Sequence, residues 1–334
     1  MQGVLEQAVL GIDISKDKVD VALMSVERAV STATFENKPK GFQQLMKWLG
    51  RQQQQPLHAC LEATGRYGQA LAEYLYAQGH CVSVVNPSRI HAYGRSKLRR
   101  TKTDKSDAQL MADFCATQQP PLWMPSTLHQ QELQELTRQL DDLKQARTRV
   151  SNRLGSGMRS QTVRRLLQEQ LDLLDEQLRQ LEQAIRDHLQ ADEQTRTSFE
   201  LLLSIPALGP LTAARFLAEV PDIHLFQSAD QLAAYAGLVP RHAQSGSSVK
   251  RKTTLAKNGN SHLRTAFYMP ALSAERFNPL IAQFAQRLRS SPEPKSKMTI
   301  IAAIMHKLLV LAYGVLKSGL PFDPNYAQAH QRAT

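Results

Sequence analysis

The sequence has few cysteines, and the three that it contains lie far apart. Cys60, Cys81 and Cys115 show no CxxC spacing, so we expect neither a zinc site nor a disulfide framework. This sparse usage is typical of a reducing compartment. Cys60 and Cys81 lie in apolar runs, which favours packing in a core over reactivity.

The sequence also lacks a long uninterrupted hydrophobic run. The longest apolar stretch, residues 298–316, is broken by His306, Lys307 and Gly314. It therefore falls short of the roughly 18 apolar residues that indicate a membrane span, and we interpret it as a buried helix. No basic segment followed by an apolar one marks the N-terminus. We expect a cytoplasmic protein with no membrane partner.

Acidic residues are outnumbered in this chain. Its 334 residues include 30 Asp and Glu against 41 Lys and Arg, which gives a net charge of +11. Such an excess favours a polyanionic partner, and nucleic acid is the first candidate. The alternative is a merely soluble basic protein. The length predicts two or three domains.

Residues 1–122 are expected to form an α/β domain. Apolar and polar residues alternate through residues 8–35 as a strand meander, and the runs LHACLEA and HCVSVVNP predict two further strands with helices between them. A meander followed by alternating strands and helices is typical of a mixed sheet with an RNase H-like fold. We expect the last helix of this domain to run from Ser106 to Thr117.

Leucines at alternating steps of three and four dominate residues 123–195. This heptad pattern predicts two long helices in a coiled-coil hairpin or a dimer stalk, with an ordinary helical bundle as the alternative. We expect residues 196–325 to form a mostly α-helical C-terminal domain and residues 326–334 a polar tail. The apolar positions of the heptad pattern are Leu133, Leu136, Leu140, Leu143, Leu167, Leu171, Leu174, Leu178, Leu181 and Ile185.

Four acidic residues are the strongest candidates for a functional site. Asp13 and Glu62 lie where predicted strands end, and Asp104 and Asp107 lie three residues apart at a predicted helix start. Carboxylates are hard oxygen ligands suited to Mg²⁺ or Mn²⁺. Two such ions support phosphodiester chemistry. For Asp104 alone, a helix N-cap is the simpler interpretation.

Basic residues gather in two segments that are candidates for nucleic-acid binding. The first abuts the acidic pair and is expected to be a loop that grips the phosphate backbone. The second is expected to be a polar loop between two helices. It carries Ser245 in a Gly/Ser-rich stretch, where an exposed serine is a possible nucleophile, although such stretches are usually linkers. The candidate residues are Arg89, Arg95, Lys97, Arg99, Arg100, Lys102 and Lys105 in the first segment, and Lys250, Arg251, Lys252, Lys257 and Arg264 in the second.

Gly209 and Pro210 predict a tight turn before a helix in SIPALGPLTAARFLAEV. This pattern resembles a helix-hairpin-helix element, in which backbone N–H groups at a helix N-terminus bind a phosphate. Similar turns also link plain helices, so DNA contact at Gly209 and a simple connection both remain open.

Several motifs together resemble one known family, the DEDD-type insertion-sequence transposases, which are related to Piv-type DNA invertases. The resemblance covers nearly the whole chain in the same order. It implies a RuvC-like RNase H domain joined by a coiled coil to a C-terminal domain. The motifs are GIDISKDKVDVAL, LEATGRYG, VNPSRIHAYGRSKLRRTKTDKSDAQLMA, IPALGPLTA, YAGLVPRHAQSG and KNGNSHLRTAFYMPA.

The resemblance also implies roles for the candidate residues. Asp13, Glu62, Asp104 and Asp107 would form a metal-binding tetrad, and Ser245 would be the nucleophile, with Ser247 and Ser248 as its alternatives. The implied partners are donor DNA, target DNA and a structured noncoding bridge RNA. The implied assembly is a homotetramer, a dimer of dimers.

Three functions remain open at this point. The first, which the resemblance favours, is RNA-guided DNA strand exchange through a phosphoserine intermediate assisted by Mg²⁺. The second is a RuvC-like nuclease that hydrolyses branched DNA with water. The third is a noncatalytic nucleic-acid scaffold, against which the four acidic residues argue.

Overall fold

The chain forms two compact units in a computed structural model. The first unit covers residues 1–125 and the second covers residues 126–334. The structure describes residues 7–52, 56–63, 67–97, 104–157, 159–220, 222–241, 244–245, 249–250, 254–256, 258–291 and 295–325.

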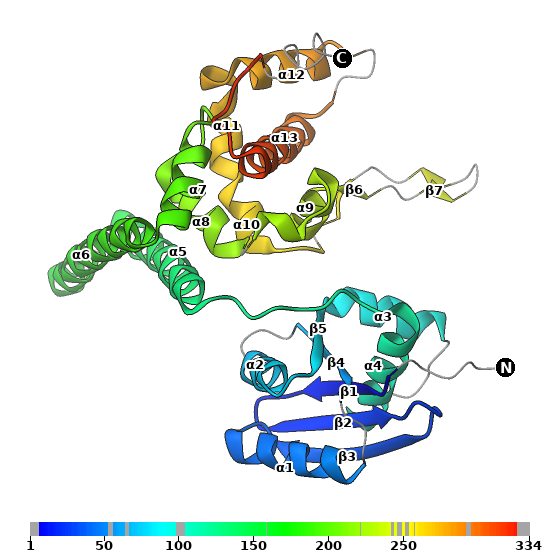
Figure 1. The fold of residues 1–334 in the computed structure, drawn as a ribbon. Coiled ribbons are helices and arrows are strands. Elements are labelled where there is room, and N and C mark those ends of the chain that lie inside the picture. Colours follow the sequence, from blue (N-terminus) through cyan, green and yellow to red (C-terminus); the bar gives the residue numbers. More distant parts are fainter. Residues whose placement is uncertain are drawn as a thin grey trace. The chain divides into compact units, whose positions relative to one another are not determined.

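A five-stranded mixed sheet organises the first unit (Figure 1). The strand order is β3-β2-β1-β4-β5, with β1 antiparallel to β2, β2 antiparallel to β3, and β1, β4 and β5 mutually parallel. This arrangement confirms the predicted RNase H-like fold. The strands are β1 (Val9–Ile14), β2 (Lys18–Met24), β3 (Val30–Glu36), β4 (His58–Glu62) and β5 (Cys81–Val85).

Helices cover both faces of this sheet. Buried side chains of α1 and α2 pack on one face with Leu10 and Ile12. Buried side chains of α3 and α4 pack on the other face with Val9 and Cys60. The helices are α1 (Pro39–Arg51), α2 (Gln69–Ala77), α3 (Pro87–Ser96) and α4 (Asp104–Gln118).

The alternation of side chains along β1 decides which residues meet α4. Leu10 and Ile12 belong to the α1 and α2 face, so Val9, Gly11 and Asp13 belong to the α4 face. At Gly11 the helix backbone itself approaches the strand. A Cβ atom added there would lie 2.2 Å from the carbonyl oxygen of Ala108.

Two sequence expectations for this unit need correction. The basic segment that begins at Arg89 is not a loop throughout, because Pro87–Ser96 forms α3. The Asn86 side chain caps this helix by accepting from the Ser88 N–H, and Pro87 occupies the first turn, where a missing N–H is tolerated. The helix expected from Ser106 starts earlier, with α4 beginning at Asp104.

Two long helices open the second unit, as the heptad pattern predicts. They are α5 (Leu128–Gly155) and α6 (Gln161–Ala191), which pack against each other within one chain. Val150, Leu167 and Leu174 are buried between them. Hydroxyl groups cap both N-termini, Thr127 accepting from the Gln130 N–H and Ser160 from the Val163 N–H.

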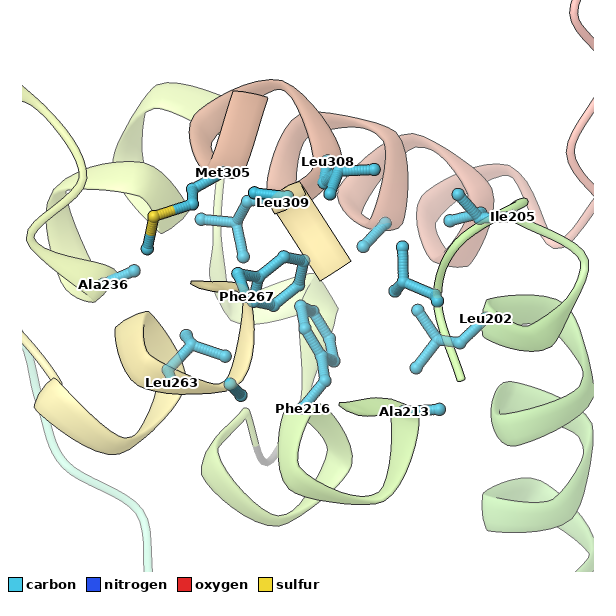
Figure 2. Close-up of a cluster of buried hydrophobic side chains, with 14 of the residues drawn as sticks. Leu202, Ile205, Ala213, Phe216, Ala236, Leu263, Phe267, Met305, Leu308 and Leu309 are labelled. Atoms are coloured by element: carbon cyan, nitrogen blue, oxygen red, sulfur yellow. The ribbon is translucent and has the colours of Figure 1, made fainter. Parts of the chain in front are cut away.

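Shorter helices surround one apolar core in the rest of the second unit. Phe216 and Phe267 lie in this cluster with ring centroids 6.1 Å apart (Figure 2). The helices are α7 (Glu193–Leu203), α8 (Pro210–Glu219), the 3-10 helix η2 (Ile223–Leu225), α9 (Ala229–Ala236), α10 (Ser261–Ala266), α11 (Tyr268–Phe277), α12 (Pro279–Arg289) and α13 (Lys297–Ser318).

The long apolar run near the C-terminus forms α13. Among the described residues it is one helix that is long and apolar enough to cross a membrane, judged by length and composition alone. Its side chains Ile304, Leu308 and Ala312 are fully buried in the core of the second unit. This confirms the interpretation of the run as a buried helix.

The polar loop expected between α9 and α10 contains paired strands. Strand β6 (Pro240–Arg241) pairs with β9 (Thr254–Leu255), and β7 (Gln244–Ser245) pairs with β8 (Val249–Lys250), both antiparallel. We call the described residues between α9 and α10 the arm, which are residues 237–241, 244–245, 249–250, 254–256 and 258–260. The expectation of a plain loop is wrong here, because each of these strands is only two residues long, too short for the alternation that marks a strand in a sequence.

Gly11→Ala should destabilise the protein, because the new methyl group would overlap the backbone of α4. Overpacking of this kind lowers the free energy of unfolding by about 1–3 kcal/mol. Denaturant unfolding measures it. The control is Gly50→Ala in α1, where no atom lies within 4 Å of an added Cβ and the protein should gain stability. A Gly11→Ala protein as stable as the wild type would contradict the close contact.

Candidate active site

Three carboxylates converge at one edge of the sheet. Asp13 is the penultimate residue of β1 and Glu62 is the last residue of β4. These strands are parallel and in register, with Ile12 opposite Leu61, so the two carboxylates lie at the same end of the sheet. Asp20 lies directly opposite Asp13 in the antiparallel register of β1 and β2.

Helix α4 brings the other two predicted acidic residues to this edge. Asp104 and Asp107 both lie in its first turn. Residues three apart share one helix face, and the positive end of the helix dipole stabilises carboxylates in this turn. The close contact of α4 with β1 at Gly11 fixes the helix against the strand that carries Asp13.

The pKa of Asp13 reflects the electrostatic repulsion between this residue and the neighbouring carboxylates. It is raised from 3.8 to about 6, first by partial burial and then by repulsion from Asp107, Asp104, Glu62 and Asp20, in that order. Burial and neighbouring negative charge both disfavour the ionised carboxyl. The four predicted carboxylates therefore form one electrostatic cluster, which we call the acidic cluster, and the buried Asp20 adjoins it.

Lys18 and Asp20 adjoin the acidic cluster, and the sequence analysis did not name them as candidates. Asp20 is 4% exposed and accepts a hydrogen bond from Thr34 Oγ1 at 2.6 Å. Lys18 Nζ lies 2.5 Å from Asp104 Oδ2 and 3.2 Å from Asp20 Oδ2. Hydrogen bonds to Asp104 and Asp20 raise the pKa of Lys18. The signal was the alternation in KVDVAL, which places Lys18 and Asp20 on the same strand face.

The donor chemistry of the acidic cluster fits a hard divalent cation. All four groups offer carboxylate oxygens, which Mg²⁺ and Mn²⁺ prefer, and their mutual repulsion at Asp13 is what a cation would relieve. Among the described residues, no three His, Cys, Asp or Glu side chains are already arranged around a single ion position. The Lys18 ammonium lies among these carboxylates instead.

The candidate basic residues of the first unit that the structure describes, Arg89, Arg95, Lys97 and Lys105, are exposed. The guanidinium carbon of Arg89 lies 5.5 Å from the centroid of the Phe114 ring, and Lys97 Nζ lies 2.9 Å from Asp113 Oδ2. Arg95 and Lys105 are also exposed on α3 and α4. Arg99, Arg100 and Lys102 lie outside the described residues.

The candidates of the second unit lie on the arm and at two helix ends. Ser245 is on β7 and Lys250 is on β8. Arg264 donates from Nη1 to the carbonyl oxygen of Ala236 at 3.1 Å, which holds the end of α9. The exposed Gly209 is the N-cap of α8 and has open space beside it. Outside the described residues lie Ser247, Ser248, Arg251, Lys252 and Lys257.

Asp13→Asn should stabilise the metal-free protein at neutral pH. The raised pKa means that the folded state binds this proton more tightly, so the carboxylate destabilises the fold as pH rises from 3.8 to about 6 and fully above that range. After discounting for solvent screening, the gain at pH 8 is about 1 kcal/mol. It should vanish below pH 3.8.

Thermal melts in EDTA across this pH range measure the effect. The control is Asp17→Asn, which removes a carboxylate from the exposed turn between β1 and β2. An equal gain in stability for Asp13→Asn at pH 4 and pH 8 would contradict the raised pKa of Asp13 in the acidic cluster.

Comparison with known proteins places both units in one family. A DEDD-type transposase model matches residues 10–162, and a model described as "Transposase IS116/IS110/IS902 family" matches residues 199–286. The pilin gene-inverting protein of Moraxella bovis is 35% identical over 323 residues, which cover 96% of this chain and 98% of that protein.

Further relatives agree with this placement. The pilin gene-inverting protein of Moraxella lacunata is also 35% identical over 323 residues, with the same coverage. The transposase for insertion sequence element IS1111A of Coxiella burnetii is 28% identical over 209 residues, 54% of this chain and 56% of that protein. The chain belongs to the IS116/IS110/IS902 family of transposases with a DEDD domain, enzymes that act on DNA.

Proposed function

We propose that this protein is the recombinase of an insertion sequence and exchanges strands between donor and target DNA through a phosphoserine intermediate. Ser245 is the nucleophile, and the acidic cluster holds Mg²⁺ or Mn²⁺. The observation that carries the proposal is the convergence of four carboxylates, with Asp13 and Glu62 at the same end of two parallel strands and Asp104 and Asp107 in the first turn of α4. The raised pKa of Asp13, caused by burial and by the neighbouring carboxylates, agrees with it. Perturbed groups of this kind gather at functional sites.

The serine step exchanges one phosphate ester bond for another, so the free energy of the broken phosphodiester bond is kept for rejoining. The Ser245 hydroxyl attacks a DNA phosphorus and loses its proton, so a serine O–P bond forms while one phosphodiester P–O bond breaks. The released deoxyribose oxygen takes up a proton. Attack by a deoxyribose hydroxyl of the other strand reverses these steps and rejoins the DNA without nucleotide hydrolysis.

The acidic cluster supports this step by holding a cation near the phosphate. A bound Mg²⁺ supplies Lewis-acid stabilisation of the charge that develops on the phosphate oxygens. Asp13 and Glu62 are held by strands, and Asp104 and Asp107 by the first turn of α4. Rigid elements of this kind keep ligands in place better than loops do.

The charge of the chain and its family suggest which partners it binds. The net charge of +11 and the exposed Arg89 and Arg95 on α3 favour donor and target DNA and a structured bridge RNA. Exposed Leu166 and Leu173, seven residues apart on α6, favour assembly of chains into dimers and a dimer of dimers. The enzyme then works in the bacterial cytoplasm, at the nucleoid.

We also assign a function to each of the three segments of the chain. Residues 1–122 serve as the RuvC-like domain, 123–195 as the coiled coil, and 196–325 as the serine-bearing domain. The names of the Moraxella relatives favour DNA inversion as one outcome of the same exchange.

A hydrolytic nuclease is the second candidate. Residues of the first unit alone supply the whole acidic cluster. A water molecule in place of Ser245 would cut DNA without joining it to the protein, as a RuvC-like nuclease of branched DNA would.

A covalent-adduct assay separates these two functions. The protein is incubated with donor DNA, target DNA, the noncoding RNA transcribed beside its gene and Mg²⁺, and is then run on a denaturing gel. Ser245→Ala should lower adduct formation by at least about a thousandfold, because it removes the nucleophile. Asp13→Ala should lower it through loss of the cation.

Matched substitutions test the two assignments. Ser247→Ala and Ser248→Ala are the controls for the serine, and Asp17→Ala is the control for the aspartate. All three should still form the adduct. DNA cleavage without any adduct, lost in Asp13→Ala alone, would replace the recombinase by the nuclease.

A further inference from the structure

A buried carboxylate in the second unit has no part in the function proposed above. Glu219, the last residue of α8, is 3% exposed. Arg138 of α5 donates to it twice, from Nε to Oε1 at 2.9 Å and from Nη2 to Oε2 at 3.0 Å. A buried charge requires partners of this kind, and the bidentate geometry fixes the direction of both side chains.

The end of α8 is bound to α5 by two further amides. Gln130 Nε2 donates to the carbonyl oxygen of Leu217, and Gln134 Nε2 donates to that of Ala218, each at 3.3 Å. The last carbonyl groups of a helix have no partner within the helix. Side chains of α5 therefore supply these partners, and α8 ends on the surface of the coiled-coil hairpin.

The same carboxylate also holds the base of the arm. Asn260 Nδ2 donates to Glu219 Oε2 at 2.6 Å, and the Asn260 N–H donates to the carbonyl oxygen of Tyr235 at 2.7 Å. Tyr235 Oη in turn donates to the carbonyl oxygen of Glu219 at 3.1 Å. Tyr235 lies in the last turn of α9, where the arm begins, and Asn260 is the N-cap of α10, where the arm ends.

Two glycines bring the ends of the arm into backbone contact. A Cβ added at Gly259 would lie 2.3 Å from the nitrogen of Gly237 and 2.3 Å from the carbonyl oxygen of Tyr235. Gly237 also has φ of +68°, which favours glycine. Beyond this contact Val239 and Ala256 are joined by a backbone hydrogen bond of 2.9 Å, followed by the pairing of β6 with β9.

We propose that Glu219 is a positioning residue that ties the arm to the coiled-coil hairpin through Asn260 and Arg138. Through this link the hairpin sets the direction in which the arm leaves the helical core. Placement of a reacting group affects rate strongly, and a shift of about 1 Å can slow a reaction about 100-fold. The role of the arm in catalysis rests on the function proposed above, while the link itself rests on the geometry.

Asn260→Asp breaks this link and also removes the longer hydrogen bond from Asn260 Nδ2 to Tyr235 Oη at 3.4 Å. The new side chain keeps the oxygen that accepts from the Leu263 N–H and caps α10. It replaces the donor to Glu219 by an oxygen, so two carboxylates face each other. DNA recombination at saturating DNA should slow by about 10- to 100-fold, while the apparent affinity for DNA stays the same.

A second substitution should restore the link. In the double variant Asn260→Asp with Glu219→Gln, the glutamine amide nitrogen replaces Oε2 and can donate to the new carboxylate, and the glutamine oxygen replaces Oε1 and can still accept from Arg138 Nε. The bond from Arg138 Nη2 to Oε2 is lost. Positions 219 and 260 together carry one carboxylate in the double variant, as they do in the wild type. Recombination should return to within about threefold of the wild-type rate, as expected for two groups that interact directly.

The control is Asn278→Asp, a second asparagine that caps a helix. Asn278 is 1% exposed, accepts from the Leu280 and Ile281 N–H groups, and donates to the carbonyl oxygen of Pro206 at the opposite end of α7 from the hairpin. The substitution should lower the melting temperature at least as much as Asn260→Asp does. It should leave the recombination rate unchanged well below that temperature.

Three results would overturn the positioning role: an unchanged rate in folded Asn260→Asp, an equal slowing in Asn278→Asp, or no recovery in the double variant. Recombination is measured apart from the covalent adduct. Slowing in Asn260→Asp together with an active Ser245→Ala protein would keep the positioning role and reject the serine. Loss of recombination in Ser245→Ala with full activity in Asn260→Asp would do the reverse.

Discussion

The contact of α4 with β1 at Gly11 is the constraint on which the acidic cluster depends. The helix backbone lies where any side chain on this residue would be. Because the contact is between backbones, it leaves little freedom in the distance between strand and helix. Asp13 lies two residues along the strand from Gly11, Asp107 directly precedes Ala108, and Asp104 lies one turn before Ala108. The separation of these carboxylates therefore depends on the contact at Gly11.

Short sequence patterns predict the strands of the first unit and the positions where these strands end. Alternation places Asp13 and Glu62 at strand ends, and the order of strands and helices predicts the mixed sheet. The alternation within each strand does not set the register between β1 and β2, which depends on the conformation of the turn that joins them. This is why the pairing of Asp13 with Asp20, and the position of Lys18, were found only in the structure.

The second unit shows the same division. Leucine spacing predicts α5 and α6, and both helices form. Arg138 and Glu219, however, are separated by 81 residues, and neither interrupts the periodicity of its helix. A buried ion pair at such a separation has no signature in a single sequence. The apolar pattern of a helix predicts which of its faces is buried. It does not predict which polar side chain of a second helix contacts the end of the first.

Lys18 gives the acidic cluster a positive charge of its own. Its ammonium group lies against Asp104 and Asp20 and is carried by the same chain. A carboxylate cluster that relied on a metal alone would couple folding to the supply of that metal. The resident lysine offsets part of the repulsion among these carboxylates with a charge that the chain itself carries. In the function proposed above, a divalent cation would then be needed mainly when a phosphate brings further negative charge to the same place.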